Sequence, residues 1–293
     1  MKKQTIFRGV ATALITPFRD GEVDFASLGK IIEYQINSGI DALVIAGTTG
    51  EASTLSESER YALYEFAAER CRGKIPIVFG TGTNDTKTAV KHTKKAAELG
   101  ADAALVVTPY YNKGTADGII SHYKNIANSA DLPIILYNVP SRTGSNLSTE
   151  AIYELCNEEN IVGLKESSDS ADRLVNLSFF MDRLSIYAGN DSQVHLTLSL
   201  GGKGVISVAS NIVPKQVLNI TQSYARGDTY ASLKAQKELL PLCHALFIET
   251  NPAPIKYAMS RAGFCRGELR LPLAEVSAQT KAMIDKLIQK ADY

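Results

Sequence analysis

The sequence predicts an α/β protein, a (β/α)₈ TIM barrel followed by a C-terminal helical region. Two observations carry this prediction. Short, nearly continuous apolar runs occur eight times, and segments with helical spacing lie between them. Strands that are apolar on both faces are typical of a parallel sheet covered by helices, and eight such units close a barrel. An open, doubly wound sheet is the structural alternative, although the stretch GTGTND lacks the G-x-G-x-x-G fingerprint of dinucleotide-binding folds.

The predicted strands are short apolar runs, and segments with helical spacing separate them. The predicted strands are GVATALITPF (9–18), DALVIAGTTGE (41–51), IPIVFGTG (75–82), DAALVVTPYY (102–111), LPIILYNVP (132–140), IVGLKES (161–167), LSIYAGND (184–191) and GVISVAS (204–210). Ser56 and Glu59 form an S-x-x-E capping box, which predicts a helix start. Gly39, Gly73 and Gly100 fall where helices should end.

After residue 227 the pattern is helical only. The three segments are TYASLKAQKELLPLCHALFIE (229–249), PAPIKYAMSRAG (252–263) and PLAEVSAQTKAMIDKLIQKADY (272–293). No stretch between them is rich enough in Gly, Ser or Pro to act as a mobile linker. We therefore predict a catalytic barrel over residues 1–227 and a helical region over residues 228–293.

Composition excludes several classes of protein. Of the 293 residues, 45% are hydrophobic, and Lys plus Arg equal Asp plus Glu at 31 each. A net charge of zero argues against a nucleic-acid or anionic-membrane partner. The four cysteines are far apart with no C-x-x-C, so neither a disulfide framework nor a zinc site is indicated. Arg8 interrupts the apolar run near the start, and no run has transmembrane length. We expect a soluble, cytoplasmic protein.

In a (β/α)₈ barrel the active site lies at the carboxyl ends of the strands. Hydroxyl groups, tyrosines and one amine gather there, at Thr48-Thr49, Tyr110-Tyr111, Tyr137, Lys165 and Gly189-Asn190-Asp191. By contrast, the GGKG stretch at 201–204 precedes the eighth strand and lies at the opposite end. It also lacks the hydroxyl residue of a phosphate-binding loop, so we interpret it as a tight turn.

Lys165 stands where a buried strand ends, in NIVGLKESSDS (160–170). It is either a surface-seeking lysine, a partner of Glu166, or an amine held partly out of water. In the third case, loss of hydration favours the free amine, which condenses with a carbonyl to give a Schiff base. The four histidines lie in helical segments, so a metal site or a Ser-His-Asp triad is not indicated. The residues thus favour metal-free carbonyl chemistry through an imine.

Seven ordered blocks are specific enough to indicate a family. They are GVATALITPF, AGTTGEASTLS, VTPYYN, LYNVPSRTG, VGLKESS, GGKGVISVASN and ETNPAPIKYA, and they extend over nearly the whole chain. The chain resembles the dihydrodipicolinate synthase family of the N-acetylneuraminate lyase superfamily. That resemblance implies condensation of pyruvate with L-aspartate 4-semialdehyde to 4-hydroxy-tetrahydrodipicolinate, in the diaminopimelate and lysine pathway, without a metal or other cofactor.

The resemblance also implies a role for each matching residue. Lys165 would form the Schiff base with pyruvate, and Tyr137 would donate and accept protons above the imine. Thr48 and Tyr111 would connect Tyr137 to bulk water as a proton relay.

Four further residues would bind substrate. Thr49 would hold the pyruvate carboxylate, the backbone carbonyl of Ile206 would line the pyruvate pocket, and Gly189 would line the site. Arg142 would bind the carboxylate of the semialdehyde.

Two alternatives remain. Another pyruvate-dependent aldolase of the superfamily would act on N-acetylneuraminate or a keto-deoxy sugar acid. Arg142 argues against it, because a guanidinium binds a carboxylate bidentately and gains little from a polyol. A catalytically inactive barrel that binds carboxylates is the other alternative, although the lysine, the tyrosine and both threonines are all present.

Assembly and regulation are also implied by the resemblance. Members of the family place the tyrosine that matches Tyr111 in the neighbour's site, so we expect a homotetramer built from tight dimers. In members that lysine inhibits, two histidines and a glutamate stand where this chain has Glu57, Arg60 and Thr88, whereas Tyr110 and Asn84 are kept. Thr88 cannot neutralise an ammonium group, so we expect weak or absent inhibition by lysine.

Overall fold

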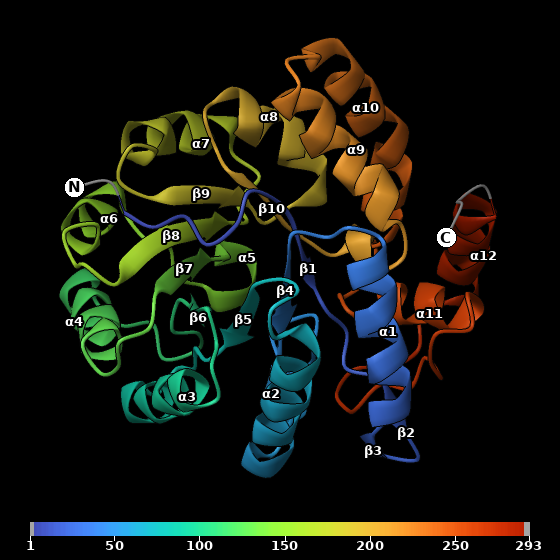
Figure 1. Cartoon of the computed structure of the whole chain (residues 1–293), viewed down its shortest axis with the longest axis horizontal. Coiled ribbons are helices and arrows are strands. Elements are labelled where there is room, and N and C mark those ends of the chain that lie inside the picture. The colour runs from blue at the N-terminus through green and yellow to red at the C-terminus, as the bar shows by residue number, and fades with distance from the viewer. Residues whose placement is uncertain (1–2, 290–293) are drawn as a thin grey trace.

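A computed structural model of the chain, which describes residues 3–289, contains a closed barrel of eight parallel strands (Figure 1). The barrel closes because β1 pairs in parallel with both β10 and β4. This confirms the predicted fold, and the open-sheet alternative is wrong. The barrel strands are β1 (Gly9–Ala13), β4 (Ala42–Ile45), β5 (Ile77–Gly80), β6 (Ala103–Val107), β7 (Ile134–Asn138), β8 (Ile161–Glu166), β9 (Ser185–Ala188) and β10 (Gly204–Ser207).

Helices surround the barrel on its outer face (Figure 1). They are α1 (Phe25–Asn37), α2 (Glu57–Cys71), α3 (Thr86–Glu98), α4 (Ala116–Ala127), α5 (Pro140–Thr143), α6 (Thr149–Leu155), α7 (Ala171–Leu177), α8 (Val194–Ser199) and α9 (Pro214–Ala225). A short hairpin of β2 (Phe18–Arg19) and β3 (Glu22–Val23) precedes α1. The sequence did not predict this hairpin, because two residues a strand are too few to show a period.

Local signals start and stop the helices as predicted. The Ser56 side chain accepts from the backbone N–H of Glu59, whose carboxylate accepts from the N–H of Ser56 in return, so the capping box at α2 is confirmed. Gly39, Gly73 and Gly100 follow helices with φ of +80°, +71° and +81°. Glycine adopts this left-handed conformation at low cost, which lets the chain leave the helix.

Two apolar cores hold the barrel. The larger lies between the strands and the helices, and the smaller fills the barrel interior. Phe7 belongs to the inner core and stacks on Tyr187 with ring centroids 4.3 Å apart, while the Tyr187 hydroxyl donates to the Phe7 carbonyl. Phe7 precedes β1, so this pair fills the end at which the strands start. The GGKG turn at 201–204 lies at the same end, as predicted, since β10 begins at Gly204.

The pairing of β7 with β8 contains a register shift. Ile134 pairs with Ile161 but Ile135 pairs with Gly163, so Val162 is an extra residue in β8. Side chains alternate between the two faces of a strand, and a bulge therefore exchanges the faces of the residues that follow it. Beyond the shift, Tyr137 pairs with Lys165, and the Lys165 amine lies over the Tyr137 ring, which belongs to the inner core.

The C-terminal region consists of α10 (Thr229–Ala245), α11 (Ala253–Arg261) and α12 (Ala278–Ile288). Helix α10 packs against α9, and α12 packs against α10 and α11. The predicted helix over 272–293 is wrong at its start, because α12 begins only after Ser277, which caps it through its side chain. Residues 290–293 of that prediction lie outside the described residues. The division of the chain at residue 227 stays a prediction.

The segment before α12 is fixed by Arg270, whose guanidinium binds Glu59 of α2 and lies over the Phe18 ring. Hydrogen bonds from Arg270 lower the pKa of Glu59 from its ordinary 4.5 to about 2. A carboxyl group with a depressed pKa stabilises the fold above its ordinary pKa. That contribution is lost as the pH falls from 4.5 toward 2.

We therefore expect Glu59→Gln to destabilise the protein at pH 7 by about 1–3 kcal/mol, since the shift corresponds to roughly this energy once partial exposure is discounted. The difference in thermal midpoint between variant and parent should shrink between pH 5 and pH 3. Glu98→Gln, which removes an exposed pair with Lys95, is the control and should change little at any pH. A difference that stays constant with pH would contradict the assignment.

Candidate active site

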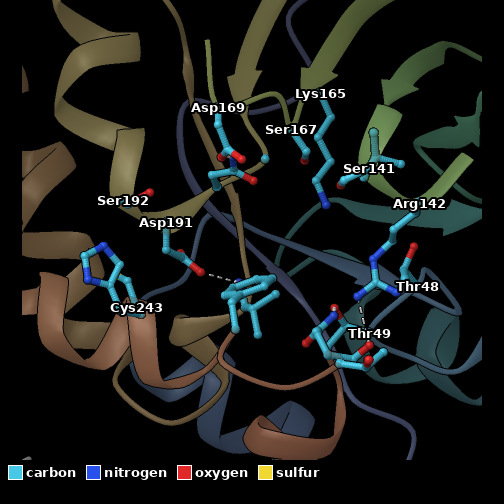
Figure 2. A pocket seen from close by; sticks show the side chains of 18 of the residues that line it. Thr48, Thr49, Ser141, Arg142, Lys165, Ser167, Asp169, Asp191, Ser192 and Cys243 are labelled. Carbon is cyan, nitrogen blue, oxygen red and sulfur yellow. Dashed lines mark hydrogen bonds between the residues drawn. The ribbon is translucent and has the colours of Figure 1, made fainter. Parts of the chain in front are cut away.

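A cavity of about 800 Å³ opens at the carboxyl ends of the barrel strands (Figure 2). Its wall brings together side chains from strands far apart in the sequence. Six of the eight residues predicted for the site line it, namely Thr48, Thr49, Tyr137, Arg142, Lys165 and Gly189. Lys165 and Arg142 both point into this space in Figure 2. The cavity therefore lies where the fold predicts an active site.

Lys165 is nearly buried, with 5% of its surface exposed, and its Nζ is 4.2 Å from the centroid of the Tyr137 ring. In the described part of the chain no salt bridge joins it to a carboxylate. The surface-lysine interpretation is thus wrong. An amine held at the cavity wall without an ion-pair partner has its lone pair available once it loses its proton, which is what attack on a carbonyl requires.

Glu166 does not pair with Lys165, so the second interpretation is also wrong. Its carboxylate is fully buried and accepts hydrogen bonds from the Asn138 amide and from Arg173 of α7. Burial raises the pKa of Glu166, and the charge of Arg173 opposes that shift. The two consecutive ionisable residues are therefore separated by the sheet, with the acid bound to its own cation on the outer side.

Asp191 lines the cavity, although no role was predicted for it. Its buried carboxylate accepts from the backbone N–H groups of Val208 and Ala209, both at 2.9 Å, and its second oxygen has no hydrogen-bond partner in the described structure. Burial raises the pKa of Asp191; hydrogen bonds and the nearby charge of Lys165 oppose the shift. Asp191 thus places a buried carboxyl group in the lining of the cavity that also contains Lys165.

Gly189 lies just before Asp191 and contacts the end of β8. Its N–H donates to the Glu166 carbonyl at 2.7 Å. A Cβ at this position would lie 1.8 Å from the Ser167 hydroxyl and 2.8 Å from the Glu166 carbonyl. Only glycine allows the loop after β9 to approach the residues next to Lys165 this closely.

Thr49 and Arg142 are connected through Asn251, which precedes α11. The Asn251 side-chain amide donates to the Thr49 hydroxyl at 3.0 Å, and Arg142 donates to the Asn251 carbonyl at 3.0 Å. Thr49 is buried, whereas Arg142 lies on the short helix α5 after β7. The sequence assigned no role to Asn251, because only the folded chain brings residue 251 beside residues 49 and 142.

Two predicted residues do not line this cavity. Tyr111 is 89% exposed, and it lines a neighbouring cavity of about 810 Å³ that also contacts Thr48, Tyr137 and Arg142. Ile206 is fully buried in the inner core. The roles predicted for both residues stay predictions.

The residues that bear on lysine inhibition already have partners. Glu57 forms a 2.7 Å salt bridge with Lys91, and the Arg60 guanidinium donates to the carbonyls of Gly80 and Ala52. Thr88 donates to the Asp85 carboxylate. The Glu57 carboxylate, which could compensate in part for Thr88, thus already has Lys91 as its partner. Weak or absent inhibition by lysine stays a prediction.

Residues 3–289 contain neither a cluster of metal ligands nor a helix that could cross a membrane. No three His, Cys, Asp or Glu side chains there are grouped in a way that could hold a metal ion. The histidines lie in α3, α4, α8 and α10, as predicted. None of the helices that the structure describes combines the length and the apolar character needed to cross a bilayer.

The fold and the site together define a (β/α)₈ barrel with a buried, unpaired lysine facing a polar cavity. This is the arrangement of enzymes that bind carbonyl compounds through an imine. The sequence model of the Dihydrodipicolinate synthetase family matches residues 6–291. The chain belongs to this family.

The following relatives match nearly the whole chain. The 4-hydroxy-tetrahydrodipicolinate synthase of Clostridium novyi (strain NT) is 44% identical over 286 residues, which is 97% of each chain. The crystal structure of dihydrodipicolinate synthase from Thermotoga maritima is 41% identical, with a TM-score of 0.96 over 98% of this chain and 99% of that one. A monomeric variant of dihydrodipicolinate synthase is also 41% identical, with a TM-score of 0.95 over 97% and 96% of the two chains.

Proposed function

We propose that this protein is a 4-hydroxy-tetrahydrodipicolinate synthase, a lyase that condenses pyruvate with L-aspartate 4-semialdehyde in the diaminopimelate and lysine pathway. The observation that carries the proposal is the nearly buried, unpaired amine of Lys165 at the wall of a polar cavity. Relatives with this activity are 44% identical over nearly the whole chain. The cytoplasm is the compartment that we propose for this biosynthetic activity.

The first half of the reaction is imine formation. The Lys165 amine attacks the keto carbon of pyruvate, and loss of water leaves an iminium. Thr49 binds the pyruvate carboxylate through its hydroxyl, with Ile206 and Gly189 lining the pocket. A methyl proton then leaves, because the iminium accepts the electron pair, and an enamine forms. Tyr137 lies next to the amine and moves protons to and from the imine.

The second half joins the two substrates. The enamine carbon attacks the aldehyde carbon of the semialdehyde, whose carboxylate binds Arg142. The semialdehyde amine then attacks the imine carbon and displaces Lys165, which closes the ring and frees the enzyme. Every bond is made and broken by the two substrates, Lys165 and transferable protons, so the reaction needs no metal or other cofactor.

The test of this function is covalent trapping. Pyruvate with sodium borohydride should add one reduced pyruvate per chain, on the peptide that contains Lys165. Lys165→Ala should abolish the label and reduce turnover by several orders of magnitude, because the covalent route is lost. Lys256, which is also buried but is paired with Glu51, is the internal control and should stay unlabelled. Label elsewhere, or none, would disprove the assignment.

Arg142→Ala should weaken productive binding of the semialdehyde and leave pyruvate condensation largely intact. Arg142 is exposed in the single chain, so its pair with the substrate carboxylate is a hydrogen bond to a charged group near the surface. Such a bond contributes about 1.5–3 kcal/mol, and kcat/KM for the semialdehyde should fall accordingly. The measurement is steady-state kinetics with borohydride trapping in parallel. Arg266→Ala, which removes an exposed pair with Asp20, is the matched control. Trapping that falls as far as turnover would contradict this division of roles.

We further propose a homotetramer whose functional unit is a tight dimer. Tyr111 is 89% exposed in the single chain, which suits a residue that enters a neighbour's site, and tyrosine is favoured at interfaces. Sedimentation analysis should show a tetramer, and Tyr111→Phe should lower turnover without loss of folding. Tyr153→Phe, at a tyrosine that is also exposed, is the control. A fully active monomer would refute the proposal.

A further inference from the structure

A buried ion pair joins the loop after β4 to helix α11. Lys256 Nζ is 2.6 Å from Glu51 Oε1, and both side chains have no exposed surface. The Lys256 amine also lies 4.1 Å from the centroid of the Phe18 ring, and burial lowers its pKa. Removing two charges from water costs free energy, and two apolar side chains of similar volume would often stabilise a fold at least as much as a buried ion pair. Neither residue has a part in the chemistry proposed for Lys165.

The acid of this pair ends the turn that contains Thr48 and Thr49. Glu51 has φ of +53° and Ala46, before the turn, has φ of +51°. Non-glycine residues adopt this conformation at a cost, so the surrounding contacts must hold it. The N–H of Glu51 donates to the Thr48 carbonyl at 3.1 Å. The position of the Glu51 side chain is therefore coupled directly to the backbone of the threonine pair.

Both oxygens of the Glu51 carboxylate bind the C-terminal region. One binds Lys256, and the other accepts from the backbone N–H of Arg270 at 3.2 Å. The Glu51–Lys256 bond joins residues 205 positions apart in the sequence. It therefore connects the turn after β4 directly to α11. Compared with apolar contact, a short, directional pair fixes the distance and orientation of the two segments more tightly.

The same segment of the chain reaches the groups proposed to bind the two substrate carboxylates. Asn251, five residues before Lys256, donates to Thr49 and accepts from Arg142. The stretch 251–256 thus contacts the turn at two points, Thr49 and Glu51, and orients Arg142 through a backbone carbonyl. A displacement of this stretch would move Thr49 and Arg142 together but would leave Lys165, on β8, in place.

We propose that the Glu51–Lys256 pair positions Thr49 and Arg142 relative to each other, and so sets the affinity of the site for both carboxylate substrates. Lys256 is a positioning residue, because it contacts neither substrate. This inference rests on the proposed function. It predicts that loss of the pair changes binding of both substrates while the amine of Lys165 stays reactive.

The test uses Lys256→Met, which keeps the unbranched side chain and removes its charge. Misplacement by about 1 Å at a binding group costs up to about 100-fold, so kcat/KM for each substrate should fall by about 10- to 100-fold. The loss should come from KM for both pyruvate and the semialdehyde. Borohydride labelling of Lys165 at saturating pyruvate should remain complete. Arg261→Met, on the same helix, removes an exposed pair with Asp285 and should leave both KM values unchanged.

A second variant separates positioning from folding. Lys256→Met leaves an unpaired buried carboxylate and should lower the thermal midpoint, whereas the double variant Glu51→Gln/Lys256→Met buries no charge and should recover stability. If the pair positions the site, both KM values stay high in the double variant. If both return to within about twofold of the parent, the pair is only a structural element and the proposal is overturned.

The parent enzyme distinguishes this outcome from failure of the proposed function. A parent chain that pyruvate and borohydride do not label at Lys165 would disprove the imine mechanism, and this inference with it. A parent that is labelled and active, beside a double variant with normal KM values, would disprove the positioning role alone.

Discussion

The extra residue in β8 determines which way Lys165 points. Were Ile135 to pair with Val162, strict alternation would exchange the faces of Lys165 and Glu166. The amine would then lie among the helices and the carboxylate would face the cavity. A polar group buried without a partner costs several kcal/mol. Both groups therefore need the observed register, because it lets Glu166 bind Arg173 and Asn138 and lets Lys165 reach the cavity. The site depends on one bulge.

The bulge is reinforced on both sides of the sheet. Outside, Arg173 binds Glu166 and also donates to the Leu147 carbonyl, which ties α7 to the segment before α6. On the cavity side, Gly189 brings the loop after β9 against the Glu166 carbonyl. The end of β8 is thus held from both neighbouring strands. Such rigidity suits an amine that must meet a carbonyl carbon at one angle, because orientation contributes a large part of catalysis.

The sequence predicted the parts of the fold that local patterns encode. Eight apolar runs, the capping box at Ser56 and the terminal glycines at 39, 73 and 100 all reflect short-range rules, and each is present. Rules that link strand ends to active sites placed Lys165, Tyr137 and the threonine pair at one cavity. The role predicted for Arg142 came from the ordered sequence blocks that resemble the family, and not from the hydrophobic periodicity of any segment.

The remaining features arise from contacts that no local pattern shows. Val162 is an ordinary apolar strand residue, and only its pairing with β7 makes it a bulge. Lys256 lies in α11 and Asn251 just before it, and their partners at 51 and 49 are some 200 positions away. Residues 272–276, just before Ser277, were predicted to be helical and are not. This segment is held instead by Arg270, whose side chain binds Glu59 and the Thr54 carbonyl.

The two buried lysines show how one side chain serves two purposes. Lys256 is enclosed with a carboxylate at 2.6 Å, which favours its charged form, and it has no exposed surface that a substrate could reach. Lys165 lies over an aromatic ring at the cavity wall, without a salt bridge, and nearby Asp191 is bound to two backbone N–H groups. The Lys256 ammonium is tied to a carboxylate and fixes the geometry of two segments, whereas Lys165 has no such tie and lines the cavity. The structural lysine and the lysine proposed to react therefore differ in their nearest carboxylate and in their access to the cavity, although both are buried.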